Sequence, residues 1–85
     1  MTFSPGTQIA YVPAHACGDI NHPDVEFGFV TSTWEKIVFC RFWSNDDSNR
    51  LRTVANSESV LANRLLVHET HPQRQIDVLL QQKST

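Results

Sequence analysis

GFVTSTWEKIVFCRFW, residues 28–43, is the stretch that decides the fold of this 85-residue chain. It ends one segment, Val25–Ser32, and contains a second, Glu35–Trp43. Both are rich in β-branched and aromatic residues, which favour strands, so we expect two strands here. Thr33 and Trp34 are left between them as a tight connection. The stretch therefore predicts an antiparallel hairpin with Trp34 exposed at its tip.

The second of these strands has two apolar faces. On the face that we expect to point into the core lie Val38, Cys40 and Phe42. The opposite face carries Ile37, Phe39, Arg41 and Trp43. A strand with this pattern is expected at the centre of a sheet, partly covered on both sides. Gly28 in the preceding strand predicts a bulge or a sharp bend.

The chain before the hairpin predicts one further strand and a long loop. Thr7–Val12 alternates, with Ile9 and Tyr11 on one face, and it stops at Pro13. Residues 13–24, PAHACGDINHPD, contain the residue types that turns prefer. Loops of this length are uncommon in a small domain and often carry function. The loop is therefore the first place to look for a site.

The chain after the hairpin predicts a polar loop and two short strands. Ser44–Arg50 is the polar loop, and Leu51–Val54 is expected to return as a short strand. Val60–Arg64 is expected to form one helical or 3-10 turn, and Leu65–His68 to be the last strand.

The C-terminal segment predicts an α-helix over about residues 71–82. Thr70 is suited to cap its first turn, and Gln73 is placed to complete a capping box. Ile76, Leu79 and Leu80 follow at i, i+3 and i+4, which gives the helix one apolar stripe to bury.

This order of elements resembles an SH3-like small barrel. It implies a mainly β fold of about five antiparallel strands with a C-terminal α-helix. We expect one domain over residues 1–85, with the barrel over about residues 7–68. Eighty-five residues leave no room for a second core.

The loop and the strand after it carry a second resemblance. Residues 11–32, YVPAHACGDINHPDVEFGFVTS, are similar to short proteins of tailed bacteriophages and prophages. The shared positions are Tyr11-Val12-Pro13, His15-Ala16, Gly18-Asp19, His22-Pro23-Asp24, Glu26, Gly28, Val30 and Thr31. The resemblance implies a mobile-element origin and brings no known activity with it.

Composition excludes several classes of protein. With 40% apolar and 19% charged residues, the chain has the composition of a soluble globular domain. It has no apolar run of membrane-spanning length and no secretory signal, so we expect a cytoplasmic protein that does not bind membranes. Its net charge of −2 argues mildly against nucleic acid as the main partner. Two cysteines are too few for a disulfide framework.

The loop offers a group of potential ligands spaced H-x-C-x4-H-x-D. These are His15, Cys17, His22 and Asp24, and Cys40 is a further candidate ligand from across the sheet. One hypothesis is a zinc site, since nitrogen, sulfur and oxygen ligands are all present. A second is a Cys17 nucleophile with a histidine base, oriented by Asp19 or Asp24. The interpretation that we favour is a loop held closed by its own polar side chains, with no cofactor and no catalysis.

The second candidate site is aromatic and consists of Trp34, Phe39, Arg41 and Trp43. Exposed aromatic residues beside an arginine are typical of protein-binding surfaces. The same group, with Arg50 and Arg52 on one face, would stack on nucleic-acid bases instead. A third possibility is that the helix stripe covers this face, Phe39 above all.

The prediction is therefore a non-catalytic binding module whose partner is a protein, with nucleic-acid binding as the alternative. An uncovered aromatic face also predicts a homodimer with Trp34 or Trp43 at its centre.

Overall fold

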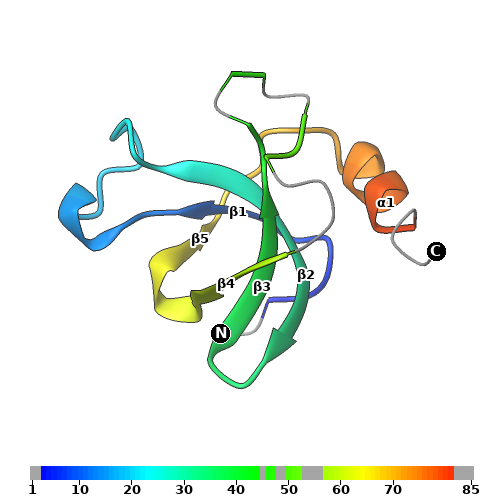
Figure 1. Ribbon diagram of the computed structural model, residues 1–85, viewed down its shortest axis with the longest axis horizontal. Coiled ribbons are helices and arrows are strands. Elements are labelled where there is room, and N and C mark those ends of the chain that lie inside the picture. Colours follow the sequence, from blue (N-terminus) through cyan, green and yellow to red (C-terminus); the bar gives the residue numbers. More distant parts are fainter. Residues whose placement is uncertain (1–2, 45, 48–49, 53–56, 82–85) are drawn as a thin grey trace.

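The protein is mainly β, with five antiparallel strands in one sheet and one C-terminal helix. The computed structural model describes residues 3–44, 46–47, 50–52 and 57–81. Its elements (Figure 1) are β1 (Gln8–Tyr11), the 3-10 turn η1 (Ala14–Ala16), β2 (Glu26–Trp34), β3 (Ile37–Phe42), β4 (Glu58–Leu61), the 3-10 turn η2 (Ala62–Arg64), β5 (Leu65–Val67) and helix α1 (Gln73–Gln81). None of the helices in these ranges is long and apolar enough to cross a membrane.

The strands lie in the order β4-β3-β2-β1-β5, and every neighbouring pair is antiparallel. The two outer strands, β4 and β5, follow each other in the chain and are joined only by η2. The predicted strand count, the short turn before the last strand and the C-terminal helix are thus confirmed. Among the described residues no ladder joins β4 to β5, so closure into a full SH3-like barrel stays a prediction.

The hairpin turn lies two residues later than predicted. Thr33 and Trp34 still belong to β2, where they pair with Val38 and Ile37. The turn consists of Glu35 and Lys36, and Glu35 takes the left-handed φ of 55°. The physical reason is that a β-branched residue and an aromatic residue extend a strand well, whereas two charged residues suit a solvated turn.

Gly28 is needed for a close backbone approach. A Cβ atom at this position would lie 2.0 Å from the carbonyl oxygen of Arg41 on β3, a separation that no side chain allows. The predicted bulge itself lies further along β2, where the pairing with β3 shifts between Val30 and Ser32. Strand curvature is therefore concentrated over residues 28–32.

The core lies on the face of β3 that the alternation predicted. Val38, Cys40 and Phe42 are all 2% exposed or less. They pack with Phe3, Ile9, Val30 and Leu65 into one buried cluster. Two further clusters occupy the other face of β1 and β2, one beneath the Pro13–Asp24 loop and one beneath α1.

The region between β3 and β4 differs from its prediction. Leu51 forms a single bridge with Trp43, and Arg52 belongs to no strand. The other two residues of the predicted strand Leu51–Val54, at positions 53 and 54, lie outside the described residues. Val60 and Leu61 belong to β4, so the 3-10 turn begins at Ala62. The apolar residues at positions 60 and 61 suit a strand that pairs with β3.

Helix α1 covers the sheet beside Trp43. Its Ile76 is fully buried and packs with Phe29 and Trp43, while Leu79 and Leu80 are half-buried against them. Trp43 is therefore only 5% exposed, and it also stacks on the His71 ring, with centroids 4.0 Å apart. The prediction that Trp43 is an exposed anchor, or the centre of a dimer, is wrong. The stripe that the sequence predicted covers Trp43 rather than Phe39.

The start of α1 is held by Gln8 instead of by a capping box. The Gln8 side-chain oxygen accepts hydrogen bonds from the backbone N–H groups of Thr70 (3.1 Å) and His71 (2.9 Å), and its nitrogen donates to the His71 carbonyl (2.7 Å). Gln73 donates to the carbonyl of Gly6, and the Thr70 hydroxyl bonds the His71 ring. The side chains of Thr70 and Gln73, which the sequence predicted as caps of the helix, thus make other hydrogen bonds.

Candidate functional site

The Pro13–Asp24 loop is a folded structure at the end of the molecule opposite α1 (Figure 1). Beneath it, Ala16 and Val25 are buried against Ala10 and Val12. Four backbone hydrogen bonds of 3.0–3.1 Å connect residues of the loop to one another, and a fifth, of 3.1 Å, joins the Val25 N–H to the His22 carbonyl. Cys17 and Gly18 take left-handed φ values of 53° and 79°, which reverse the chain after η1. The loop is therefore fixed well enough to hold its side chains in a defined arrangement.

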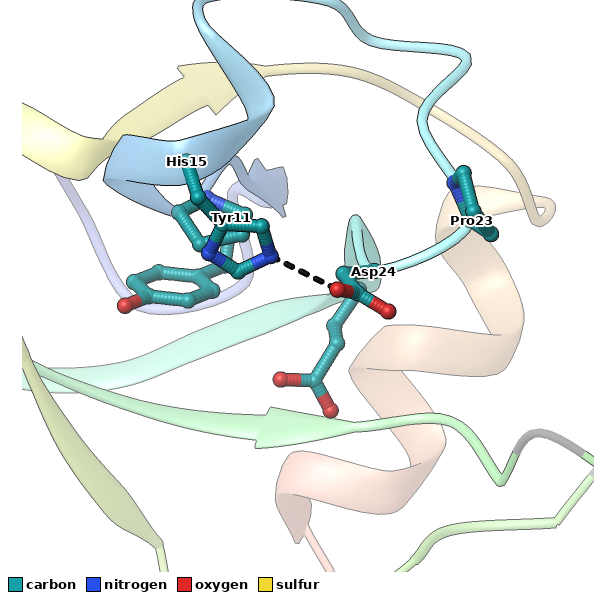
Figure 2. Close-up of a pocket in the computed structure, with 6 residues that line it drawn as sticks. Tyr11, His15, Pro23 and Asp24 are labelled. Carbon is teal, nitrogen blue, oxygen red and sulfur yellow. Dashed lines mark hydrogen bonds and ion pairs between the residues drawn. The ribbon is translucent and has the colours of Figure 1, made fainter.

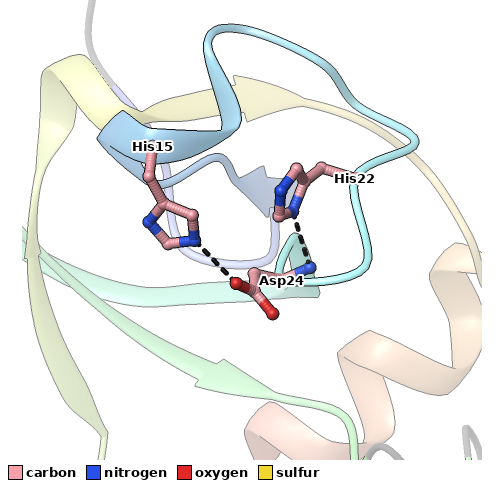
Figure 3. A group of neighbouring side chains, drawn as sticks. All are labelled: His15, His22 and Asp24. Carbon is pink, nitrogen blue, oxygen red and sulfur yellow. Dashed lines mark hydrogen bonds and ion pairs between the residues drawn. The ribbon is translucent and has the colours of Figure 1, made fainter.

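His15, His22 and Asp24 come together on this loop (Figure 3). Nε2 of His15 lies 2.6 Å from the Oδ2 atom of Asp24, and Nδ1 of His22 accepts a hydrogen bond of 3.0 Å from the Asp24 backbone N–H. The two imidazole rings meet edge to face, with centroids 5.3 Å apart. The hydrogen bond from His15 lowers the pKa of Asp24 below its ordinary value, so its carboxylate is ionised at neutral pH.

Neither cysteine joins this group. Cys40 is fully buried in the core, where burial raises the pKa of its thiol to about 12. The hypothesis that Cys40 reaches the loop ligands is wrong, because its side chain points to the other face of the sheet. Cys17 is exposed, and its Sγ atom lies 3.8 Å from the His15 backbone oxygen rather than near an imidazole.

Asp19 has a structural function in the loop. Its Oδ1 atom accepts a hydrogen bond of 2.9 Å from the backbone N–H of Asn21, which closes a tight turn. It is therefore not placed to orient a histidine base. In the described part of the chain the Cys17–histidine pair with an orienting aspartate is not assembled.

An open hollow of about 320 Å³ lies beside His15 and Asp24 (Figure 2). It is lined by Tyr11, Pro13, His15, Pro23, Asp24 and Glu26. Glu26 also forms an ion pair with Arg52, which in turn pairs with Glu58. Tyr11 and Glu26 were not predicted as lining residues, although they stand at the ends of the two strands that flank the loop, and that position is the only signal the sequence gives.

The outer face of the sheet carries an apolar surface at the hairpin end. Trp34 pairs with Ile37 and Ile37 pairs with Leu61, so these three side chains form one row across β2, β3 and β4. Trp34 is 64% exposed and Leu61 56% exposed. Half-buried Phe39 follows two residues along the same face of β3. We call these four residues the Trp34 surface.

The predicted aromatic cluster is thus divided between two environments. Trp34 and Phe39 belong to the Trp34 surface, whereas Trp43 is beneath α1. Arg41 is half-buried and pairs with Phe29, a residue that α1 covers. Leu61 was missed because the sequence placed it in a turn, and its exposed apolar side chain is apparent only once β4 is paired with β3.

In the part of the chain that the structure describes, the arginines of the nucleic-acid hypothesis are divided between the two sides of β3. Arg52 forms ion pairs with Glu26 and Glu58, and its guanidinium lies 5.3 Å above the Phe42 ring, on the core side of β3. Arg41 is on the opposite side of that strand. Arg41 and Arg52 therefore do not lie on one face, which the nucleic-acid hypothesis requires of them.

Comparison with known proteins found no relative of this chain. No protein-family model, no curated protein and no solved structure matches the chain.

Proposed function

We propose that this protein is a small non-catalytic binding module that docks a partner protein on the Trp34 surface. The observation that carries the proposal is the apolar row of Trp34, Ile37 and Leu61 across three strands, in which Ile37 is half-buried between two exposed side chains. Large apolar side chains at the centre of a surface supply most of the binding energy in protein interfaces, and tryptophan is the most enriched of them.

The surroundings of this row support the same proposal. Lys36, Leu61, Ala62 and Asn63 line a small hollow of about 180 Å³ beside it. Such a hollow is large enough for one apolar side chain of a partner, and Lys36 at its edge suits a partner with acidic residues around that anchor. The row has a paired support, because β3 pairs at Ile37 with Trp34 of β2 on one side and with Leu61 of β4 on the other.

The resemblance of residues 11–32 to tailed-phage proteins gives this proposal a biological setting. We infer that the chain is an accessory protein of a mobile element, and that its partner is a bacterial host protein. An accessory protein that interferes with a host system needs a binding surface and no catalysis of its own.

The experiment is capture from bacterial lysate with the tagged protein as bait. Wild type is compared with Trp34→Ala and with Leu66→Ala, a control at a 51%-exposed apolar residue of β5. We expect one specific partner to be retained by wild type and by the Leu66 variant and to be lost by the Trp34 variant. Truncation of a central interface tryptophan weakens binding by about 2 kcal/mol or more.

Two results would overturn the proposal. One is the absence of any protein enriched over an empty-tag control. The other is equal recovery by wild type and Trp34→Ala. Circular dichroism melting of the three proteins ensures that a lost partner reflects a lost contact, since substitutions at exposed positions seldom change stability by more than about 0.5 kcal/mol.

A further inference from the structure

We propose that His15, His22 and Asp24 form a binding site for a divalent transition-metal ion of the zinc type, with two imidazole nitrogens and one carboxylate oxygen as ligands. One such ligand atom from each residue lies within 4.8 Å of the other two. Ligand atoms that share a zinc ion at about 2.1 Å are roughly 3.0–3.4 Å apart. Side-chain rotations at this exposed site are enough to close that difference.

The ligand set selects the class of ion. Imidazole nitrogen suits zinc, nickel, copper and iron, whereas calcium and magnesium prefer oxygen ligands alone. Three protein ligands leave a coordination position for water, as in open zinc sites. With Cys40 in the core and Cys17 turned towards a backbone oxygen, the site contains no sulfur.

The hydrogen-bond pattern is compatible with this coordination. The Asp24 carboxylate can only accept, so Nε2 of His15 donates the 2.6 Å hydrogen bond. A metal ion would take the place of that hydrogen, and the His15 ring would carry its proton on Nδ1 instead. Nδ1 of His22 already accepts a hydrogen bond, so its lone pair needs no change of tautomer to bind the ion. The Asp24 backbone N–H would then bond water.

The loop supplies the rigidity that such a site requires. His15 is carried by η1, between two turn hydrogen bonds of 3.0 and 3.1 Å, and the buried side chain of Ala16 anchors that turn. His22 and Asp24 precede Val25, which is buried beneath the loop, and Val25 N–H bonds the His22 carbonyl at 3.1 Å. The three ligands are therefore placed on both sides of one closed loop.

The test is isothermal titration calorimetry of the full chain with zinc chloride, together with visible absorption of the cobalt(II) form. We expect one ion per chain, and at least about a tenfold weaker affinity in His22→Ala and in Asp24→Asn. Loss of a residue that only supports a ligand already weakens metal sites by about 10–100-fold. The matched controls are His68→Ala, an exposed histidine outside the loop, and Cys17→Ser.

We expect both controls to bind zinc as wild type does, and the cobalt form to lack the absorption of a sulfur ligand. The proposal is overturned if wild type takes up no zinc, if His22→Ala binds unchanged, or if Cys17→Ser loses the ion. Circular dichroism of the metal-free variants separates lost ligation from lost folding. The site shares no residue with the Trp34 surface, so this result and the capture of a partner protein are independent.

Discussion

Gln8 is a buried polar side chain whose hydrogen bonds all go to residues of the segment before α1 or of α1 itself. It is 2% exposed, and its amide bonds three backbone groups of Thr70 and His71. Gln8→Leu keeps the volume but removes these three hydrogen bonds, so we expect a loss of about 2–3 kcal/mol of unfolding free energy. Urea denaturation measures it, with the exposed Ser59→Ala as control. A loss below about 0.5 kcal/mol would contradict this role.

The sequence predicts single residues well where strand alternation decides their environment. Val38, Cys40 and Phe42 were predicted in the core because they alternate along a strand. Alternation places them on one face of β3 regardless of which other elements pack against the sheet. The burial of Gln8 and Trp43 was not predicted, since it depends on α1 and the segment before it, and α1 begins 30 residues after Trp43 in the chain. Contacts between such distant elements leave no pattern in the local sequence.

At the scale of elements, α1 acts as a cover for one end of the outer face. Ile76 is fully buried against Phe29 and Trp43, whereas Val78 on the same helix is 46% exposed. We expect Ile76→Ala to cost about 2–4 kcal/mol and to shift Trp43 fluorescence towards longer wavelength in a Trp34→Phe background. Val78→Ala is the matched control and should change neither quantity. Equal effects of the two substitutions would mean that α1 is not docked as described.

The Pro13–Asp24 loop should respond to acid through Asp24. The hydrogen bond from His15, aided by the charges of His15 and His22, lowers the pKa of Asp24 from 3.8 in the folded protein. A lowered folded pKa stabilises the protein above pH 3.8, and this contribution is lost as pH falls through the folded value. The stability difference between wild type and Asp24→Asn should therefore shrink below pH 3.8.

Denaturation series from pH 6 to about pH 2.5 measure that difference. In a His15→Ala background the carboxylate lacks its main partner, so Asp24→Asn should have a much weaker pH-dependent effect. A difference that stays constant with pH in wild-type background would show that the hydrogen bond between His15 and Asp24 does not form in solution.

Elements were predicted more reliably than their ends. The hairpin, the 3-10 turn before the last strand and the C-terminal helix all follow from local composition. The hairpin turn moved from Thr33-Trp34 to Glu35-Lys36 because pairing with β3 stabilises the longer strand. In the loop, His15, His22 and Asp24 were named as a group of potential ligands by their spacing. Only the structure excludes the two cysteines, Cys17 by the fold of the loop and Cys40 by its burial on the other face of the sheet.

At the scale of the whole molecule, the sheet separates three apolar clusters, each with its own cover. The curved face encloses one, the Pro13–Asp24 loop covers the second and α1 covers the third. The two covers lie at opposite ends of the long axis (Figure 1), so the loop and α1 do not share a site. Trp34 and Leu61 of the Trp34 surface lie outside both covers and are exposed.

The Trp34 surface bears on the predicted self-association of the protein. Because Trp43 is buried beneath α1, we expect a homodimer to form around Trp34 and not around Trp43. Two copies related by a two-fold axis would bring the same row of Trp34, Ile37 and Leu61 together. The row is short, and small interfaces give weak complexes, so we expect association only at high concentration.

Sedimentation velocity tests this expectation. The wild-type sedimentation coefficient should rise between about 10 and 500 µM, while Trp34→Ala should remain a 9.7-kDa monomer throughout. Leu66→Ala should behave as wild type, because β5 lies at the other end of the strand order. If wild type also stays monomeric at every concentration, the chain does not dimerise, and its exposed tryptophan is then available for a different protein, as the capture experiment requires.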